Sequence, residues 1–359
     1  MSALNTVDMK AILLAGGAGT RMWPMSRSNR PKQFFNIVGD QILVRDAYER
    51  LAKSFAPEDI YISTSPEFAS LLSEHFPEVE DDHIIIEPEK RDTGPAMGYV
   101  AAHLMNICPD EPIVFVPSDH YINDEELFLR CLKVGADLII KTGKLLDIAI
   151  PPVFPSTAMG YTKVASQFET IEDIEVFEFA GHTEKPNYEV AKQYLQDGSY
   201  FWHANYYMWT PRAFLDAFDR YAPETGALLR KIQKTGDNAL YSEIERISFD
   251  YAVTEKMDTQ DVLIIRGDFG WSDIGAWDSL HDRLCDEEGG NVTKGKVVCV
   301  DTKRSLVYGP PEKLVTIVGL EGVVVVDTSD ALLVCKLEDS QRLKEVRQIL
   351  KDQNHNDYL

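Results

Sequence analysis

A short apolar run that ends in a glycine-rich turn constrains this chain more than any other feature of its sequence. Residues 12–15 form the run, and three of the next four residues are glycine. The run predicts a buried strand, and the glycines let backbone N–H groups approach an anion closely because no Cβ intervenes. Arg21 and Lys32 then add positive charge. We therefore expect a polyphosphate site where the first strand passes into the first helical segment.

The loop differs from the two best-known phosphate-binding loops of proteins. The dinucleotide-binding fingerprint requires a third glycine at the position of Met22, which disfavours a nicotinamide oxidoreductase. A Walker loop requires Gly-Lys followed by Ser or Thr, whereas Thr20 and Arg21 follow Gly19 here. The loop therefore belongs to another class of phosphate-binding site.

The loop continues into Pro31-Lys32-Gln33, and with this extension it resembles the signature of sugar-nucleotide pyrophosphorylases, most closely that of the mannose-1-phosphate guanylyltransferases. The resemblance implies that the loop embraces a nucleoside triphosphate. It also implies that Arg21 and Lys32 hold the departing pyrophosphate. In this segment it assigns five residues to the nucleotide: Ala15, Gly16, Gly17, Gly19 and Thr20.

Two further segments resemble the metal-binding motifs of the same family. Residues 114–120 indicate an apolar strand that ends in Pro-Ser-Asp-His, where a lone Asp would more often be a turn or capping residue. The resemblance makes Asp119 a magnesium ligand and places Ser118 beside the nucleotide. It makes Asp273, in Gly-Trp-Ser-Asp-Ile-Gly-Ala-Trp, the second ligand. Two carboxylates with water and phosphate oxygens can complete an octahedral Mg²⁺ site.

Recognition of the base is expected from residues 87–96, which close a strand and open a helix. Thr93 can serve as the N-cap of that helix, with Pro95 in its first turn. The same stretch resembles the purine-recognition segment of the family. Guanine presents N1–H and 2-amino donors, so acceptors such as Glu87 or loop carbonyls would favour it over adenine.

Recognition of the sugar phosphate is expected from the middle of the chain. Glu184-Lys185-Pro186 resembles a family motif whose lysine grips the incoming sugar phosphate; without the motif, Lys185 would be a solvated loop lysine. Asp250 lies in a further matching motif, in which it touches the sugar or orders the site. The other residues assigned to the sugar are Gly160, Tyr161, Glu184, His203 and Asn205.

The sugar segments also depart from the family pattern. Mannose enzymes usually have Glu-Thr-Gly-Tyr-Gly-Tyr where residues 156–161 are Ser-Thr-Ala-Met-Gly-Tyr, and Trp-Asn-Ser-Gly where residues 202–205 are Trp-His-Ala-Asn. A missing carboxylate and a shifted amide change the hydroxyl pattern that a site accepts. His203 or Asn205 can compensate, and the alternative is the same reaction on another hexose or heptose 1-phosphate.

The resemblance implies Mg²⁺-dependent transfer of GMP from GTP to α-D-mannose 1-phosphate, which gives GDP-mannose and pyrophosphate. A phosphate oxygen of the sugar would attack the α-phosphorus in line, so positioning and charge neutralisation would carry catalysis. The alternative outside the enzymes is a catalytically silent scaffold subunit. The presence of Arg21, Lys32, Asp119, Lys185 and Asp273 together argues against it.

Strand-like runs alternate with helical patterns through the first half of the chain, which predicts βαβ units and ligands at the carboxyl ends of parallel strands. The fold expected is α/β, a Rossmann-like mixed sheet of the nucleotide-diphospho-sugar transferase type. We expect a catalytic domain over residues 1–286, with a sugar-binding lobe over about 148–265. Short β-branched runs predict a small β-helix-like domain over residues 287–359, closed by a helix that Asp339-Ser340 caps.

Composition limits the partners. The net charge of −22 and the lack of a basic stripe argue against nucleic acid and anionic membrane surfaces. No apolar run approaches about 18 residues, so no membrane-spanning helix is expected. Five widely spaced cysteines without a C-x-x-C pair indicate reduced thiols in the cytoplasm. The β-rich tail predicts a homodimer. The sequence has no histidine cluster for an isomerase metal site, so no isomerase activity is expected.

Overall fold

The computed structural model describes residues 8–17, 19–285, 287 and 289–359. Ala18 of the predicted phosphate loop and Asp286, where we expect the catalytic domain to end, lie outside the described residues, as does the side chain of Thr20. The chain forms two compact units. The sheet unit comprises residues 1–16, 47–118 and 122–271, and the solenoid unit comprises residues 17–46, 119–121 and 272–359. The domain division predicted near residue 286 stays a prediction.

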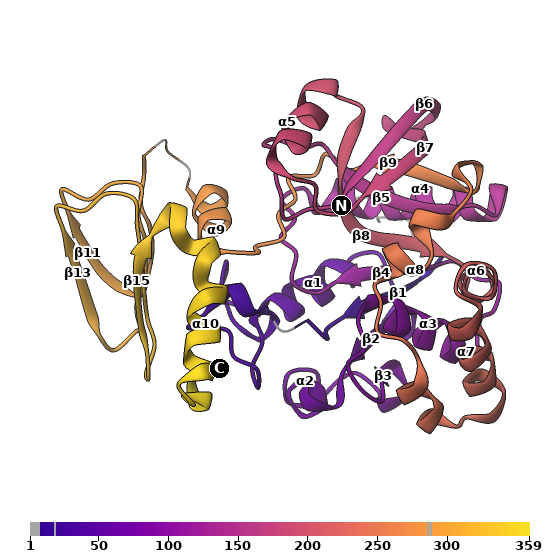
Figure 1. Ribbon diagram of the computed structural model, residues 1–359, viewed down its shortest axis with the longest axis horizontal. Coiled ribbons are helices and arrows are strands. Elements are labelled where there is room, and N and C mark those ends of the chain that lie inside the picture. Colours follow the sequence, from indigo (N-terminus) through magenta and orange to yellow (C-terminus); the bar gives the residue numbers. More distant parts are fainter. Residues whose placement is uncertain (1–7, 18, 286, 288) are drawn as a thin grey trace. The chain divides into compact units, whose positions relative to one another are not determined.

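One mixed sheet organises the sheet unit, and its described strands run in the order β3-β2-β1-β4-β8-β5-β9-β7-β6 (Figure 1). Neighbours are parallel from β3 to β4 and between β5 and β9, whereas β8 and β7 are antiparallel to their neighbours. The strands are β1 (Lys10–Leu14), β2 (Ile60–Thr64), β3 (Ile84–Ile86), β4 (Ile113–Pro117), β5 (Leu145–Ile150), β6 (Tyr161–Ile171), β7 (Ile174–Thr183), β8 (Tyr200–Trp209) and β9 (Val262–Arg266). The carboxyl ends of β1 to β4 therefore meet at one edge of the sheet.

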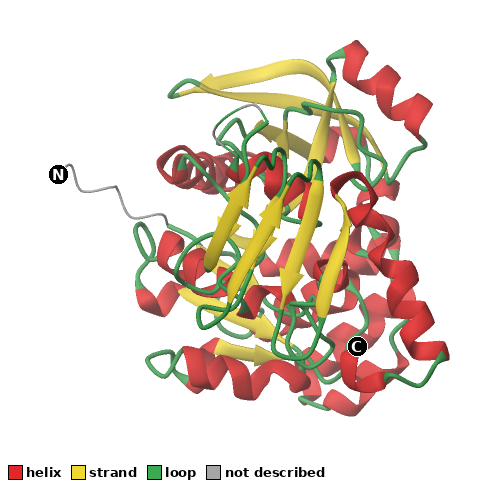
Figure 2. Ribbon diagram, turned by 90° about the vertical axis from the view of Figure 1, so that its left-hand side faces the viewer, coloured by secondary structure: helices red, strands yellow, loops and turns green. Residues whose placement is uncertain are grey.

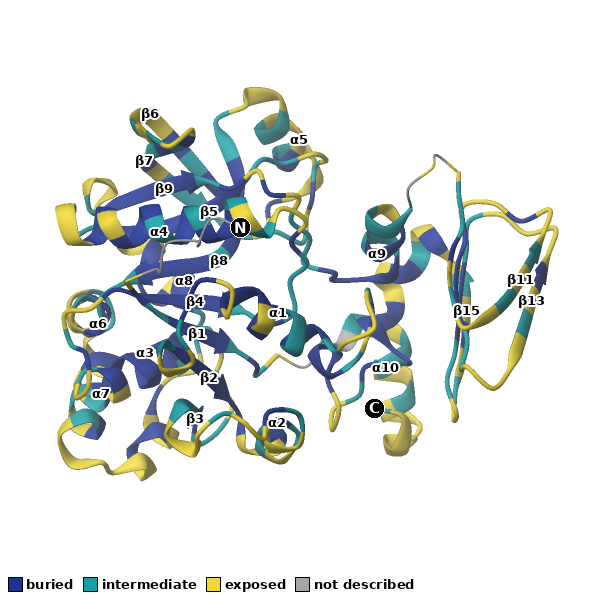
Figure 3. Ribbon diagram, turned by 180° about the vertical axis from the view of Figure 1, so that it is seen from behind, coloured by how far each residue is buried: buried dark blue, intermediate teal, exposed yellow. Residues whose placement is uncertain are grey.

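The apolar runs that predicted the first four strands do form strands, nearly at the expected bounds. Three of these strands, β1, β2 and β4, are buried on both faces because helices cover a parallel sheet from either side (Figure 3). Side chains of β8 show the two faces: Tyr207 packs on Phe249, whereas its neighbour Tyr206 packs on Phe128 of α4. The α/β class and the mixed sheet are as predicted.

Helices pack on both faces of this sheet. α3, α6 and α7 lie together and share a core with β1 and β4, in which the ring of Phe115 packs edge-on against Phe214 (Figure 1). α4 packs against β8, where a Cβ on Gly135 would lie 2.6 Å from the sulfur of Met208. The helices of the unit include α2 (Ala69–His75), α3 (Thr93–Leu104), α4 (Glu125–Thr142), α5 (Tyr188–Asp197), α6 (Pro211–Tyr221), α7 (Pro223–Thr235) and α8 (Phe249–Ala252), and α1 spans Leu43–Leu51.

The solenoid unit consists of short strands that alternate between two small sheets as the chain proceeds (Figure 2). β10, β12 and β14 are parallel neighbours with β15 antiparallel at the edge, and β11 pairs in parallel with β13. The bounds are β10 (Val292–Lys294), β11 (Lys296–Val300), β12 (Leu306–Tyr308), β13 (Leu314–Val318), β14 (Val323–Asp327) and β15 (Leu332–Lys336). Val307, Ile317 and Val325 bring both sheets into one small core. The predicted β-helix-like domain is confirmed.

Two helices complete this unit, α9 (Trp277–Leu284) and α10 (Leu343–Asp352). The closing helix is confirmed, but its predicted cap is wrong. A 3₁₀ turn (Leu337–Arg342) precedes α10, and Ser340 lies inside that turn, where its hydroxyl accepts the backbone N–H of Asp278 at 3.2 Å. Ser340 therefore braces α9 instead of starting α10.

The cysteines and the helix lengths bear on two predictions made for the whole chain. All five cysteines are free thiols, with Cys108 and Cys131 buried and the other three partly exposed. Among the described residues, no helix combines the length and apolar character needed to cross a bilayer.

Candidate active site

The predicted phosphate and metal residues of the solenoid unit gather around the ammonium group of Lys32. Its Nζ lies 2.8 Å from Oδ2 of Asp119 and donates to the carbonyl oxygen of Asp273 at 2.7 Å. The Lys32 side chain is 6% exposed. One buried cation thus contacts both residues that the sequence predicts as metal ligands.

Glycine is required where the phosphate loop meets this lysine. Gly19 has φ of +56°, and a Cβ there would lie 2.5 Å from Cγ of Lys32. Both the left-handed backbone and the close approach exclude a larger residue. The predicted loop glycine therefore lets Lys32 pass beneath the loop toward Asp119.

The Asp273 carboxylate is fixed by its own turn and by an arginine. Its Oδ1 accepts the backbone N–H of Gly275 at 3.1 Å, and its Oδ2 lies 3.9 Å from Nη2 of Arg21. A Cβ on Gly275 would lie 2.3 Å from Oδ2, so a larger residue there would displace the carboxylate. Trp277, at the end of the same motif, is buried in the core and donates its indole N–H to the carbonyl of Trp23 at 3.1 Å. The motif thus combines a carboxylate for the site with a core anchor.

Charge balance defines what this cluster can hold. Burial by itself raises the pKa of Asp119, but Lys32 and His120 outweigh burial and lower that pKa, so the carboxylate is ionised. No group of three or more His, Cys, Asp or Glu side chains with metal-ligand geometry occurs among the described residues. Magnesium needs only one or two carboxylates when phosphate oxygens and water complete its shell, and the hard oxygens of Asp119 and Asp273 suit it. The donor set fits a magnesium ion.

In the sheet unit, the predicted nucleotide residues follow strands of the parallel part of the sheet, β3-β2-β1-β4. Gly16 follows β1, Glu87 follows β3 and Ser118 follows β4. A Cβ on Gly16 would lie 3.4 Å from Oε1 of Glu87, so these two residues adjoin. The hydroxyl of Ser118 donates to the carbonyl of Leu14 at 2.7 Å, which ties β4 to β1. Ala15 is buried at the same edge.

Glu87 is the titratable group of this edge. It is 5% exposed, and its Oε2 accepts the hydroxyl hydrogen of Tyr241 at 2.8 Å. Burial raises the pKa of Glu87 to about 7, although the bond from Tyr241 opposes the rise. Glu87 therefore changes its charge near neutral pH.

The N-cap of α3 corrects one prediction. Asp92, with φ of +74°, is the N-cap, and its Oδ1 accepts the backbone N–H of Thr93 at 2.8 Å. Thr93 is instead the first helical residue, and its hydroxyl accepts the backbone N–H of Phe249 at 3.1 Å. Pro95 lies buried in the first turn, as predicted. Thr93 thus joins the base-recognition segment to α8.

The predicted sugar residues meet in a second cluster of the sheet unit. His203 is buried on β8, with Nδ1 2.8 Å from Oδ2 of Asp147 and Nε2 3.2 Å from Oδ1 of Asp250. Asn205, with φ of +60°, presents its Oδ1 to the same Nε2 at 3.1 Å. Tyr207 donates its hydroxyl hydrogen to Oδ1 of Asp250 at 2.7 Å. His203, Asn205 and Asp250 are therefore brought together.

Glu184 and Lys185 form the exposed border of this cluster. Lys185 pairs with Oε1 of Glu184, and its side chain is 62% exposed. Burial raises the pKa of Glu184, but His182 and Lys185 outweigh it and keep that pKa low. A Cβ on Gly160 would lie 2.4 Å from Oε2 of Glu184, so Gly160 is needed for close packing. Tyr161 is fully buried and its hydroxyl binds the backbone of Ser156, in the loop that precedes β6.

Sequence reasoning missed the residues that hold these groups in place. They are Asp147 and Tyr207 in strands, His182 at the end of β7, and Tyr241 opposite Glu87. Asp147 carries a signal that could have been used, since a carboxylate inside the apolar run Leu-Leu-Asp-Ile-Ala-Ile requires a buried partner. The tyrosines carry none, because aromatic residues in core strands and helices usually pack.

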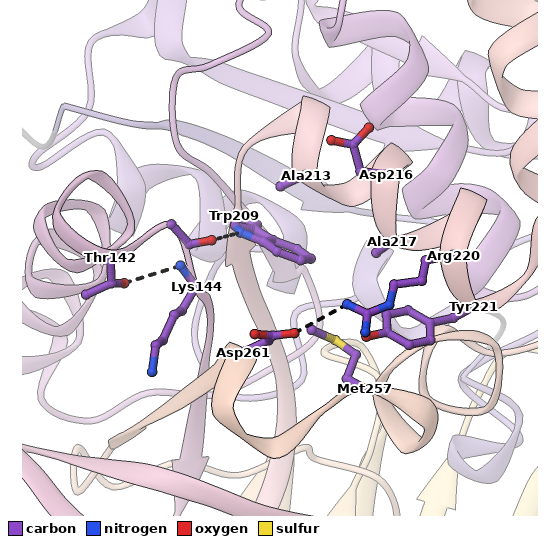
Figure 4. A pocket seen from close by; sticks show the side chains of 11 residues that line it. Thr142, Lys144, Trp209, Ala213, Asp216, Ala217, Arg220, Tyr221, Met257 and Asp261 are labelled. Atoms are coloured by element: carbon purple, nitrogen blue, oxygen red, sulfur yellow. Dashed lines mark hydrogen bonds and ion pairs between the residues drawn. The ribbon is translucent and has the colours of Figure 1, made fainter.

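A separate cavity of about 340 Å³ lies at the opposite edge of the sheet, where β5 and β9 begin (Figure 4). Its walls include Trp209, whose indole N–H donates to the carbonyl of Gly143 at 2.8 Å, and Arg220, which pairs with Asp261. None of the predicted site residues lines it.

Comparison with known proteins identifies the family. Residues 10–289 match the model of the nucleotidyl transferase family, and residues 295–350 match that of the MannoseP isomerase/GMP-like beta-helix domain. The xanthan biosynthesis protein XanB of Xanthomonas campestris pv. campestris is 33% identical over 94% of this chain and 72% of its own length. Mannose-1-phosphate guanylyltransferase 2 of Escherichia coli O157:H7 is 30% identical over 99% of this chain and 76% of its own length.

Solved structures agree with this assignment. The crystal structure of a Thermus thermophilus protein described as a mannose-1-phosphate geranyltransferase superposes with a TM-score of 0.88 at 26% identity and covers 96% of this chain and 100% of that one. A Helicobacter pylori mannose-6-phosphate isomerase shares the fold, with a TM-score of 0.59 at 18% identity over 74% of this chain and 100% of that one. The matched models and relatives show that this chain is an enzyme of the nucleotidyl transferase family.

Proposed function

We propose that this enzyme transfers GMP from GTP to α-D-mannose 1-phosphate in a Mg²⁺-dependent reaction that gives GDP-mannose and pyrophosphate. The coarser activity, nucleotidyl transfer to a sugar 1-phosphate, follows from the family and its relatives. The observation that carries the proposal is the contact of one buried lysine, Lys32, with both Asp119 and Asp273 beside Arg21. Such a cluster binds a metal and phosphate groups and supplies no nucleophile of its own.

The reaction is an in-line displacement at the α-phosphorus. A phosphate oxygen of the sugar 1-phosphate forms the new P–O bond, and the bond from the α-phosphorus to the bridging oxygen of the β-phosphate breaks. Asp119 and Asp273 would hold the magnesium ion, which when bound neutralises charge on the phosphate oxygens. Arg21 and Lys32 bind the leaving pyrophosphate, because cations there stabilise the negative charge that it carries away.

The sheet-unit residues bind and orient the two substrates. The proposal assigns guanine to Glu87 as an acceptor for N1–H and the 2-amino group, and the triphosphate to the backbone of the glycine loop. Lys185 takes the phosphate of the sugar, since its ammonium is exposed and tethered by Glu184. Asp250, Glu184, His203 and Asn205 surround the sugar ring.

The alternative acceptor is another hexose or heptose 1-phosphate. It is favoured by buried His203, which pairs with Asp147 and lies in the segment Trp-His-Ala-Asn where mannose enzymes usually have Trp-Asn-Ser-Gly. The chemistry at the phosphates would be the same. A cytoplasmic location and a homodimer built through the β-helix-like tail remain parts of the proposal, and the free thiols suit the first.

The test is pyrophosphate release by purified protein with Mg²⁺, in a panel of nucleoside triphosphates against sugar 1-phosphates. Release with GTP and mannose 1-phosphate alone supports the full proposal. Release with GTP and another sugar moves the function to the alternative. Absence of release with every pair would overturn nucleotidyl transfer and favour the scaffold reading.

A further inference from the structure

The imidazole of His203 lies between carboxylates on both of its edges. Nδ1 is 2.8 Å from Oδ2 of Asp147, and Nε2 is 3.2 Å from Oδ1 of Asp250 and 3.1 Å from Oδ1 of Asn205. Among the described residues, every side-chain atom within hydrogen-bond distance of these two nitrogens is an oxygen that accepts, so both ring nitrogens carry hydrogen. The geometry alone therefore makes His203 a buried imidazolium.

Asp147 places a carboxylate inside a buried strand, where burial of a charge is unfavourable. Every residue of β5 is buried, and the Asp147 side chain is 4% exposed, with Oδ1 lacking any partner among the described residues. A buried ion pair seldom stabilises a fold relative to apolar residues of similar size. The Asp147–His203 pair is therefore not explained by folding stability, which indicates a role in the site.

The pair acts on Asp250, the carboxylate on the other side of the ring. Within the described part of the chain, three groups approach Oδ1 of Asp250: Nε2 of His203, the hydroxyl of Tyr207 at 2.7 Å, and Nε2 of His182 at 3.9 Å. Thr254 in turn donates to the Tyr207 hydroxyl at 3.0 Å. The contacts of His203 and Tyr207 converge on Oδ1 and hold that oxygen in place, which leaves Oδ2 to accept from a ligand.

A second observation indicates that a polar ligand completes this cluster. The His182 side chain is 1% exposed, yet its Nε2 has no hydrogen-bond partner among the described residues. It lies 3.6 Å from Oε2 of Glu184 and 3.9 Å from Oδ1 of Asp250, too far to bond either. A hydroxyl group placed here could bond His182 and donate to a carboxylate, which satisfies both.

We propose that His203, anchored by Asp147, is a positioning residue that aims Asp250 at one hydroxyl of the sugar 1-phosphate and so decides which sugar the enzyme accepts. This inference rests on the proposed function. Both N–H groups of His203 are engaged, so the ring itself donates nothing to the sugar. Recognition falls to the carboxylates of Asp250 and Glu184, which require a hydroxyl donor and are left unpaired by a deoxy sugar.

The charges around the ring agree with this geometry. Burial lowers the pKa of His203, but Asp147 and Asp250 outweigh burial and raise that pKa well above its usual value. Burial likewise raises the pKa of Asp250, but His203 outweighs it and holds that pKa far below the usual range. The ring also faces Tyr207 and His182, with ring centroids 4.9 Å and 5.0 Å away. The imidazolium and the Asp250 carboxylate therefore keep their charges at neutral pH.

The kinetic test uses His203→Gln with the accepted sugar 1-phosphate and its series of monodeoxy analogues. Wild type should discriminate against one analogue by about a hundredfold or more in kcat/KM. In His203→Gln this discrimination should fall below about tenfold, with the KM for GTP unchanged within about twofold. Discrimination that persists in the variant would overturn the proposal, as would equal increases in KM for both substrates.

Two further variants keep this test decisive. His203→Gln leaves Asp147 buried without a counter-ion and can fail to fold, so Asp147→Asn/His203→Gln removes both charges with little change of volume. The double variant must show the same loss of discrimination. His103→Gln, a change at an exposed histidine near the end of α3, is the matched control and should behave as wild type.

A measurement without turnover separates this inference from the proposed function. In histidine-¹⁵N-labelled protein at about pH 8, both His203 nitrogens should show imidazolium shifts that disappear in His203→Gln, whereas a neutral ring overturns the proposal. If wild type releases no pyrophosphate, the proposed function fails, and calorimetric binding of the same sugar phosphates decides the inference instead. A weaker preference for the hydroxyl sugar in His203→Gln supports it, and no binding by wild type overturns it.

Discussion

Replacing Asp119 tests the assignment of the phosphate and metal cluster most sharply. In Asp119→Ala, Lys32 loses its 2.8 Å partner but keeps its bond to the Asp273 carbonyl at 2.7 Å. Breaking a buried ion pair costs about 3–5 kcal/mol of unfolding free energy, and the remaining bond puts this variant near the low end, about 3 kcal/mol. Asp119→Asn retains an acceptor for Lys32 and should lose only about 1 kcal/mol.

The effect on catalysis should exceed the effect on folding, and it should be the same for both variants. Either change removes one of the two carboxylates proposed to hold magnesium. Several kcal/mol of transition-state stabilisation then disappear, and about 4 kcal/mol corresponds to a roughly thousandfold lower kcat. Because one ligand remains, a higher magnesium concentration should restore part of the Asp119→Asn activity.

The assay is pyrophosphate release across a magnesium titration, with unfolding of each variant followed by denaturant. The matched control is Glu125→Gln, which removes an acid from ion pairs with Lys53 and with Arg50, whose side chain is 4% exposed; none of the three is a predicted site residue. That control should lose stability but keep its kcat within about twofold. Near-normal activity of Asp119→Asn at low magnesium would refute the metal assignment, and a loss of activity equal to that of Glu125→Gln would reduce the cluster to a structural role.

Three further outcomes are expected. Because the pKa of Glu87 is raised to about 7, its carboxylate becomes a full acceptor only as pH rises through that value, so the KM for GTP should fall between about pH 6 and pH 8. Glu87→Gln should abolish this pH dependence of KM. An unchanged pH dependence in the variant would exclude Glu87 from guanine binding. Position 19 has φ of +56°, and a Cβ there would lie 2.5 Å from Cγ of Lys32, so Gly19→Ala should destabilise the protein by more than about 1 kcal/mol and raise the KM for GTP. Thermal unfolding and steady-state kinetics measure the two effects. Lys185→Ala should raise the KM for the sugar phosphate about tenfold or more and leave that for GTP unchanged, whereas equal changes in both would contradict its assignment.

Local patterns in the sequence carry much of this fold. The apolar runs at 12–15 and 113–116 predict β1 and β4 to within two residues, because continuous hydrophobic stretches bounded by turns are typical of buried parallel strands. Valine-rich runs separated by turns likewise predict the solenoid strands. Element boundaries were less predictable. Asp92 takes the cap position expected of Thr93 because its side chain can bond the next N–H from a left-handed backbone, a geometry that sequence does not reveal.

The contacts that assemble the site depend on distant parts of the chain. Lys32, Asp119 and Asp273 lie in one compact unit although more than two hundred residues separate the first from the last. A family resemblance could assign these residues but not show that one lysine contacts both acids. Asp147 was missed because a six-residue apolar strand predicts burial and says nothing about its partner. The partner, His203, lies more than fifty residues away on β8.

The fate of isotopic label in GTP tests the central claim most directly. With sugar 1-phosphate, Mg²⁺ and GTP labelled at either the α- or the γ-phosphorus, α-label should enter the nucleotide sugar and γ-label should appear in pyrophosphate. Asp119→Asn should slow both by the same factor. Transfer of γ-label to the sugar, or its release as inorganic phosphate, would place the attack at another phosphorus and contradict nucleotidyl transfer by this enzyme.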